Sequence, residues 1–241
     1  MQSENSQFDI SQGALLNLWH EARENTQIPP SDDKIQEALN HIDLDKIQIS
    51  GHEVSYLDPE LSIDLGAIAK GYTAQLAKEA LNKAGLSNGY INAGGNVALL
   101  GEKEDGTNWK IGIQSPDASD ALVQYSTKKA TCLVTSGDYQ RYFTYKNKKY
   151  SHIIDPKTGY PANYVRSVTV ITKDSGKADA LSTTLFCMSV EDGKKYLPTL
   201  DYDVQAIWIV DKDSDVSSDL ETKDYKIITT DKIKNRVTLV D

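Results

Sequence analysis

Cysteine, excess positive charge and long apolar runs are all scarce in this sequence of 241 residues. The two cysteines, Cys132 and Cys187, lie far apart and form no CxxC pair, which argues against zinc and thioredoxin-like sites and favours two buried thiols. Lys and Arg total 26 against 35 Asp and Glu, a net charge of −9. Proteins that bind nucleic-acid polymers normally carry a basic surface, so that class is excluded, although a local basic pocket is not.

No stretch approaches about 18 consecutive apolar residues, so no transmembrane segment is expected. The first residues, MQSENSQFDISQGALL, lack the basic and apolar regions of a secretory signal peptide. Either the protein is cytosolic or further residues precede this start. A composition of 39% hydrophobic and 25% charged residues is that of a globular protein, and the length favours one large α/β or α+β domain.

Four segments have the periodicity of amphipathic helices. Residues 12–22 and a segment after Ser31, which is a suitable N-cap, carry apolar residues three and four apart. The third helix begins at Asp64-Leu65-Gly66-Ala67 and ends at Gly85. Its expected core face has apolar residues at every fourth position: Ile68, Tyr72, Leu76, Ala80 and Ala84. Residues 175–189 form the fourth, with Ala178, Leu181, Leu185 and Met188 toward the core.

The rest of the sequence predicts strands and turns. Short Val- and Ile-rich runs separated by Gly and Pro occur across residues 47–63 and 90–135, and residues 141–154 alternate around a Lys-Asn-Lys-Lys turn, as in a β-hairpin. Further strands are expected at residues 165–172, 204–210, 225–229 and 237–240. With no repeat and no linker, we expect one α+β domain over residues 1–241, with mixed sheets and packed helices.

Asp179 and Thr183 stand four residues apart on the last helix, so their side chains share a face. Carboxylate and hydroxyl oxygens together suit a hard cation such as Mg²⁺. The alternative is a solvated helix face or a local hydrogen bond. Asp64 and Lys70 similarly suggest a phosphate site at a helix N-terminus, or only a capped helix with a surface lysine.

Two further features leave alternatives open. Gly94-Gly95 follows a strand but no helix follows it, so it is either a structural turn or a loop that lets a ligand approach the backbone. His152 lies next to Asp155-Pro156, and it is either a structural histidine or a group that takes a proton from a hydroxyl nucleophile. The residues by themselves thus predict a magnesium and phosphate pocket.

Five ordered segments resemble the ApbE-type FAD:protein FMN transferases. They are SIDLGAIAKGYTAQLAKEAL, YINAGGNVALLG, TSGDYQRYF, SHIIDPKTGYPA and ADALSTTLF. The early segment FDISQGALLNLW is also similar to that family, and the resemblance covers about residues 7–210. It implies the family's fold and an enzyme that uses Mg²⁺ and FAD, attaches FMN through a phosphoester to a Thr or Ser hydroxyl of an acceptor flavoprotein, and releases AMP.

The resemblance also assigns residues. It places a metal site on Asp179, Thr183 and the backbone carbonyl of Ala67, and catalysis on His152, with Asp179 able to share that role. The implied contacts to the flavin nucleotide are Phe8, Asp9, Asp64, Lys70, Ser136, His152 and Ile153.

The family usually has further strands ahead of the FDIS-like segment, so the resemblance implies a domain lacking its N-terminal strands. It also implies an extracytoplasmic protein, membrane-anchored as a lipoprotein at full length. The alternatives are an Mg²⁺-dependent FAD pyrophosphatase, which would use water as the nucleophile, and a non-catalytic flavin-binding module.

Overall fold

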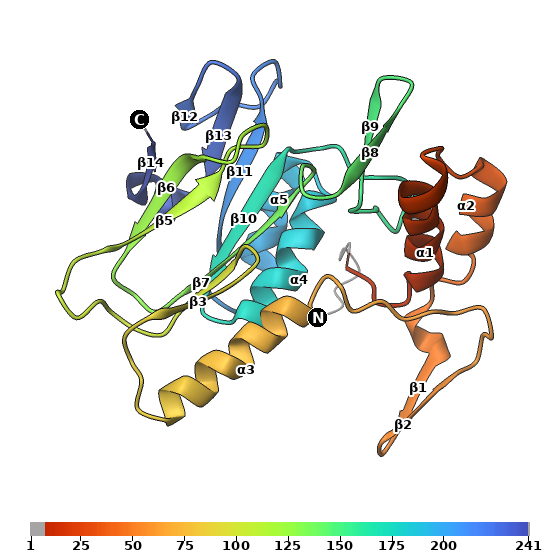
Figure 1. The fold of residues 1–241 in the computed structure, drawn as a ribbon, viewed down its shortest axis with the longest axis horizontal. Helices are drawn as coiled ribbons and strands as arrows, with labels where there is room; N and C mark the ends of the chain where they lie inside the picture. Colours follow the sequence, from red (N-terminus) through yellow and green to blue (C-terminus); the bar gives the residue numbers. More distant parts are fainter. Residues whose placement is uncertain (1–7, 241) are drawn as a thin grey trace. The chain divides into compact units, whose positions relative to one another are not determined.

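The computed structural model describes residues 8–240 and divides them into two compact units (Figure 1). Unit 1 takes in the described residues up to Gly66 together with Gln140–Ala162, and unit 2 takes in Ala67–Tyr139 and the described residues from Asn163 onward. Helices and antiparallel sheets occur together, so the predicted α+β class is confirmed. No helix within residues 8–240 is both long and apolar enough to cross a membrane.

Unit 1 combines two helices with two separate hairpins. Its elements are α1 (Gly13–Glu21), which continues as the π-helical turn η1 (Ala22–Thr26), α2 (Asp32–Leu39), η2 (Leu44–Lys46), β1 (Ile47–Ser50), β2 (Glu53–Tyr56), β8 (Tyr142–Tyr145) and β9 (Lys148–Ser151). The core contains Leu15, Trp19, Ile35 and Phe143. The indole N–H of Trp19 donates to the carbonyl of Gly159 at 2.8 Å, which ties the segment after β9 to α1.

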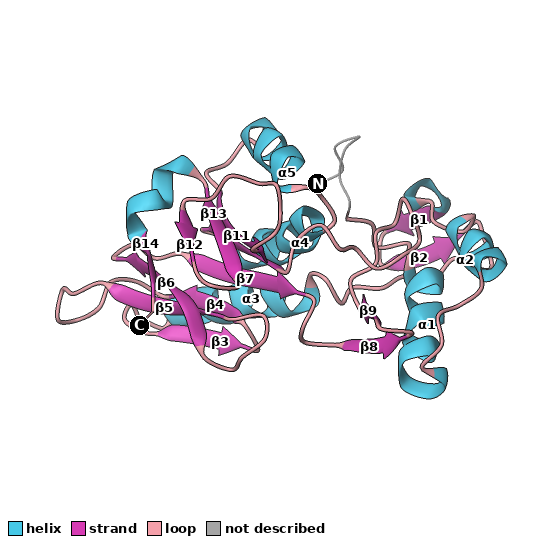
Figure 2. Cartoon of the chain, turned by 90° about the horizontal axis from the view of Figure 1, so that it is seen from above, coloured by secondary structure: helices cyan, strands magenta, loops and turns pink. Residues whose placement is uncertain are grey.

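Unit 2 is built on a seven-stranded antiparallel sheet with the order β12-β13-β11-β10-β7-β4-β3 (Figure 2). The strands of this sheet are β3 (Tyr90–Ala93), β4 (Asn96–Leu99), β7 (Cys132–Gly137), β10 (Ser167–Thr172), β11 (Gln205–Asp211), β12 (Leu220–Glu221) and β13 (Tyr225–Thr229). A three-stranded sheet contains β5 (Trp109–Gln114), β6 (Ala121–Thr127) and β14 (Val237–Leu239). The helical elements are α3 (Ala69–Lys83), α4 (Ser175–Phe186), α5 (Val190–Tyr196), η3 (Leu197–Thr199) and η4 (Asp231–Arg236).

The large sheet has a different covering on each face. The three-stranded sheet packs on one face through a core that includes Val123, Ile207 and Ile227. The helices pack on the other face, where Ser136 of β7 meets Ser182 of α4. Adjacent residues along a strand point to opposite faces, so β7 and β10 each contribute to both layers.

The structure corrects the predicted face of α3. Tyr72 and Leu76 are 57% and 48% exposed, whereas Gly71, Ala74 and Lys78 are buried. The cause is the closeness of α3 and α4, since only small side chains fit where the two helices cross. The predicted end is confirmed, because Gly85 has the positive φ of 87° that suits glycine after a helix.

Candidate active site

Asp179 is buried in unit 2, which rules out the solvated helix face as its environment. It lies in α4 with only 5% of its surface exposed. Its Oδ2 accepts a hydrogen bond of 2.7 Å from the backbone N–H of Gly71. Gly71 is in the first turn of α3, where N–H groups have no partner within the helix, so Asp179 caps α3 from a neighbouring helix.

Gly71 makes this contact possible because it has no side chain. A Cβ atom placed on it would lie 2.5 Å from the Cβ of Asp179 and closer still to the carbonyl oxygen of Ser175. The α3–α4 crossing therefore brings backbone against backbone. Alanine is not tolerated there without a shift of one helix.

Burial raises the pKa of Asp179 above its usual range, because the ionised form loses solvation. The Gly71 N–H, the neighbouring Asn96 amide and the charge of Lys70 lower that pKa, but only in part. Asn96 is 1% exposed and its Nδ2 atom has no hydrogen-bond partner among the described residues, so its amide acts on Asp179 through the field of its dipole. A bound cation would favour the ionised carboxylate.

The other predicted residues of unit 2 lie on the same two helices, in the turn before α3 or on the strand beneath them. Thr183 is half-buried one turn after Asp179, and Ala67 is half-buried in the turn that leads into α3. The Ser136 and Ser182 hydroxyl oxygens are 2.8 Å apart, and Ser182 in turn donates to the Asp179 carbonyl at 2.9 Å. The cofactor-binding candidate Ser136 is thus linked by hydrogen bonds to the backbone of the metal-binding candidate.

The donor set fits magnesium better than a transition metal. Asp179 offers one carboxylate, Thr183 a hydroxyl and Ala67 a carbonyl, all of them oxygen donors. Residues 8–240 hold no group of three or more His, Cys, Asp or Glu that could bind a metal. Mg²⁺ commonly binds through one or two carboxylates together with substrate phosphates and water, so a single buried aspartate is enough.

The predicted helix start at Asp64 is wrong. The α3 helix begins at Ala69, and Asp64 belongs to unit 1, where its Oδ1 accepts the Gly66 N–H at 2.6 Å. That bond forms a local turn five residues before the helix, so Asp64 is not the cap of α3. Lys70 does lie in the first turn of α3, with an exposed side chain, as a phosphate site would require.

Unit 1 brings Asp64 beside the predicted contacts of the FDIS segment. The Asp64 N–H donates to the Ile10 carbonyl at 2.9 Å. Asp9 is fixed in its own turn, because its Oδ1 accepts both the N–H and the hydroxyl of Ser11, at 2.8 and 2.6 Å. Phe8 is half-buried at the start of this segment.

His152 and Ile153 follow directly after β9. The Arg141 carbonyl accepts the His152 N–H at 3.0 Å and lies 3.2 Å from the ring Nδ1. If Nδ1 carries the proton for that contact, Nε2 is left as the basic nitrogen. Ile153 is buried, and its carbonyl accepts the Ala162 N–H at 3.0 Å.

Gly71 and Asn96 were not singled out from the sequence. A glycine inside a helical pattern costs about 1 kcal/mol relative to alanine, so Gly71 carried a usable signal. Asn96 directly follows the Gly94-Gly95 pair, whose positive φ values of 60° and 95° make it the turn between β3 and β4. The pair therefore forms a turn, as one of the two alternatives predicted, and the Asn96 amide beside it lies close enough to Asp179 to lower its pKa.

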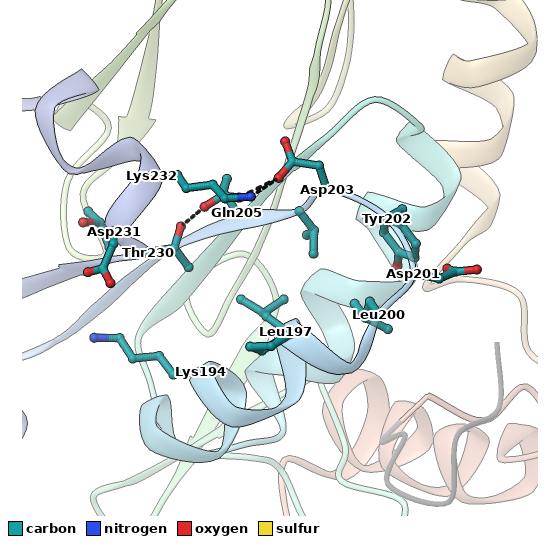
Figure 3. Close-up of a pocket in the computed structure, with 13 residues that line it drawn as sticks. Lys194, Leu197, Leu200, Asp201, Tyr202, Asp203, Gln205, Thr230, Asp231 and Lys232 are labelled. Carbon is teal, nitrogen blue, oxygen red and sulfur yellow. Dashed lines mark hydrogen bonds and ion pairs between the residues drawn. The ribbon is translucent and has the colours of Figure 1, made fainter.

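A separate hollow of about 710 Å³ in unit 2 contains none of the residues predicted from the sequence (Figure 3). Its wall includes Leu197, Tyr202, Gln205 and Thr230. Asp203, Gln205, Thr230 and Lys232 are already bonded to one another there, at 2.7 to 3.0 Å. We place the candidate active site at the α3–α4 crossing, because that is where a buried carboxylate meets a helix N-terminus.

Comparison with solved structures defines the class of the fold as that of flavin transferases. The flavin transferase ApbE from Vibrio cholerae superposes with a TM-score of 0.74 at 31% identity, covering 95% of this chain and 70% of that one. The ApbE protein from Thermotoga maritima gives 0.73 at 37% identity, covering 84% and 67%. The chain belongs to the ApbE family, whose model matches residues 1–208.

Curated relatives agree with this assignment and are longer. FAD:protein FMN transferase of Vibrio cholerae is 37% identical over 191 residues, which is 77% of this chain and 57% of the relative. The enzyme of the same description from Klebsiella pneumoniae is 37% identical over 210 residues, which is 85% and 63%. The chain therefore spans about three fifths of the length of these relatives.

Proposed function

We propose that this protein is an Mg²⁺-dependent FAD:protein FMN transferase, which attaches FMN through a phosphoester to a Thr or Ser hydroxyl of an acceptor flavoprotein and releases AMP. The observation that carries the proposal is the buried Asp179 at the N-terminus of α3, in a chain of the ApbE family. Burying this carboxylate costs solvation that one backbone N–H offsets only in part, and a bound cation would offset the remainder.

Unit 2 provides the oxygen ligands and a positive charge. Asp179, Thr183 and the Ala67 carbonyl would hold the metal ion, which would supply positive charge against the pyrophosphate of FAD. The Gly71 N–H keeps one Asp179 oxygen in place. Lys70, exposed in the first turn of α3, would bind a phosphate oxygen.

Unit 1 provides the group that takes the proton. The acceptor hydroxyl oxygen forms a bond to the phosphorus on the FMN side, and the bond from that phosphorus to the bridging oxygen breaks, so that oxygen leaves with AMP. The proton of the hydroxyl goes to Nε2 of His152, while Nδ1 stays on the Arg141 carbonyl. Displacement at phosphorus depends mainly on positioning and electrostatics, which are the roles proposed for these residues.

The remaining family residues are assigned to the flavin nucleotide. Phe8, Asp9, Asp64 and Ile153 of unit 1 and Ser136 of unit 2 would contact it. We also propose that the reaction takes place outside the cytoplasmic membrane, with a lipid anchor in the full-length protein. This rests on the family resemblance and is checked by fractionating cells that express the natural gene.

A mass measurement tests the reaction. The protein is incubated with FAD, Mg²⁺ and an acceptor flavoprotein stripped of its flavin, and the acceptor is then weighed. A gain of one FMN mass, with AMP released in equal amount, is the expected result. Free FMN and AMP with an unmodified acceptor would instead make the protein a pyrophosphatase. Intact FAD that binds saturably would make it a flavin-binding module.

A further inference from the structure

The β8–β9 hairpin is the basic part of an otherwise acidic unit. Residues 8–66 carry twelve Asp or Glu and three Lys or Arg. Residues 140–151, which form the hairpin and the two residues before it, carry four Lys or Arg and no Asp or Glu. The four are Arg141, Lys146, Lys148 and Lys149. Net charge thus reverses sign over a single hairpin, in a chain whose total is −9.

The lysines of the hairpin are placed against aromatic rings. The Nζ atoms of Lys146 and Lys148 lie 5.3 Å from the ring centroids of Tyr145 and Tyr150. Lys149 lies 4.4 Å from the centroid of Tyr142, which is itself 49% exposed. Each cation is thereby partly ordered while its charge is kept, since a ring attracts a cation without neutralising it.

Acidic partners among the described residues do not explain the charges of Lys146 and Lys148. Lys146 and Lys148 are exposed and make no ion pair with any residue between 8 and 240 that the structure describes. Lys146 also has a φ of 48° in the two-residue turn, a left-handed conformation for which glycine and asparagine are the favoured residues. Lysine is thus present at a position where the turn itself would favour another residue.

The hairpin is joined to the proposed proton acceptor. Arg141, at its base, is the residue whose carbonyl holds both the backbone N–H and Nδ1 of His152. Lys148 is four residues before His152, which corresponds to about 13 Å of extended chain. A molecule bound at the lysines would therefore lie near His152 without touching the group that takes the proton.

From this charge reversal and this connection we infer that the β8–β9 hairpin is the docking surface for an acidic segment of the acceptor protein. The inference rests on the proposed function, because it identifies the partner class of the same site. The exposed ring of Tyr142 offers apolar contact beside the charges, which suits a polypeptide.

An anionic membrane surface fits the same charges less well. Residues 8–66 of the same unit carry twelve Asp or Glu against three Lys or Arg, and this net negative charge would oppose the approach of the unit to an anionic bilayer. A short acidic segment would meet the hairpin alone. The two cases differ experimentally, because vesicles and peptides can be tested separately.

The binding test uses two fluorescein-labelled peptides that share a central Thr, one flanked by four Glu and the other by four Gln. Anisotropy is measured at low ionic strength, ~10 mM, where exposed charges are little screened. We expect the Glu peptide to bind at least tenfold more tightly than the Gln peptide. We expect Lys146→Glu with Lys148→Glu to abolish that difference, and Lys146→Gln with Lys148→Gln to reduce it about threefold.

The matched control is Lys128→Glu with Lys129→Glu, two exposed lysines between β6 and β7 that change net charge by the same amount. An equal loss of Glu-peptide binding in this control would overturn the inference, because the effect would then follow net charge. Binding to phosphatidylglycerol vesicles without binding to the Glu peptide would also overturn it. Thermal melts confirm that each variant is folded.

Failure of the proposed function gives a different pattern. If no FMN mass appears on any acceptor, the transferase function fails. Binding of the Glu peptide that depends on the hairpin lysines would still support the hairpin as a docking surface for an acidic segment. If transfer occurs and the hairpin variants keep the wild-type KM for the acceptor, the docking surface is wrong and the transferase function stands. The KM for FAD is expected to be unchanged in these variants.

Discussion

The α3–α4 crossing and the β8–β9 hairpin each present charged groups that the proposed reaction needs, and they do so by opposite means. At the crossing, one carboxylate is 5% exposed, held by a backbone N–H, with a glycine as the only residue that fits. On the hairpin, several cations are kept at the surface against tyrosine rings. The first arrangement holds one carboxylate oxygen of Asp179 in place, and the second provides a positive electrostatic potential over a surface.

This difference tells us which variants separate chemistry from recognition. Changes at the crossing should affect metal binding and stability together, because Asp179 also caps α3. Changes on the hairpin should affect the protein partner alone. Variants that break this division would show that the two regions are coupled.

The largest effect is expected from Asp179→Asn. The amide keeps the shape of the carboxylate and can accept the Gly71 N–H, but it removes the charge that would bind Mg²⁺. We expect turnover with FAD to fall by about 10⁴-fold. This corresponds to losing the several kcal/mol by which a metal ion stabilises the transition state of such reactions. Equal turnover in wild type and variant would rule out Asp179 as a ligand.

A melting experiment checks the same assignment without FAD. Mg²⁺ should raise the melting temperature of the wild type by mass action and leave that of Asp179→Asn unchanged. Thr184→Val is the matched control, because its buried hydroxyl on the same helix is bonded only to the Ala180 carbonyl among the described residues. It should keep the Mg²⁺ response.

His152→Gln should have the next largest effect, in unit 1. Glutamine cannot take up the proton, so we expect transfer to fall by about 10³-fold. Stabilisation by Mg²⁺ should be unchanged, because the proposed metal ligands are in unit 2. Two results would contradict this division between the two regions. One is a His152→Gln protein that loses its stabilisation by Mg²⁺, and the other is an Asp179→Asn protein that keeps it.

Most of the fold was predictable, because periodicity reports burial. Alternating and three-four patterns located most of the helices and strands of both units, and Gly85 marked the end of α3 correctly, but α5 and β12 were not predicted. The buried face of α3 was predicted wrongly from Tyr72 and Leu76. Hydrophobicity favours large side chains for a core, whereas a close helix crossing selects small ones such as Gly71 and Ala74.

The site was predictable only in part, because a sequence motif does not indicate which backbone N–H groups a side chain will contact in the folded protein. The pair Asp179 and Thr183 came from spacing, while its burial and its link to Gly71 depend on how two helices cross. The start of α3 was misplaced, because Asp64 is a good capping residue that instead closes a turn onto Gly66. Asn96 was not predicted as a site residue, because the Gly94-Gly95 pair before it was interpreted only as a turn or a ligand-binding loop.

Gly71→Ala should cost about 2–3 kcal/mol of unfolding free energy, since the new methyl group would overlap Asp179 and Ser175. For a chain of this size that corresponds to a fall in melting temperature of about 5–10 °C. Gly176→Ala is the matched control on the facing helix, because its nearest neighbours would lie at 3.3 Å and beyond. It should change the melting temperature by no more than a few degrees, and equal effects would mean that the helices do not approach most closely at Gly71.

The smallest effects are expected from two buried or half-buried aspartates whose pKa values move in opposite directions. Burial raises the pKa of Asp155 in unit 1, with the Lys157 N–H opposing it. For Asp219 in unit 2, burial also acts to raise the pKa, but bonds from Lys234 and Thr229 outweigh it, so the net pKa is lowered. Only the second carboxylate has donors strong enough to favour its ionised form.

The sign of the pH dependence follows from these directions. An unfolded aspartate titrates near pH 3.9. The stability from Asp155 is present below that value and is lost as pH rises through its raised folded pKa, so Asp155→Asn should become more stable relative to the wild type as the pH rises to 7. The stability from Asp219 is present above that value and is lost as pH falls through its lowered folded pKa, so Asp219→Asn should be less stable than the wild type at pH 7, by an amount that shrinks as the pH falls. Urea melts from pH 3 to pH 7 measure both, and parallel pH profiles for the two variants would show that the carboxylates do not differ in their surroundings.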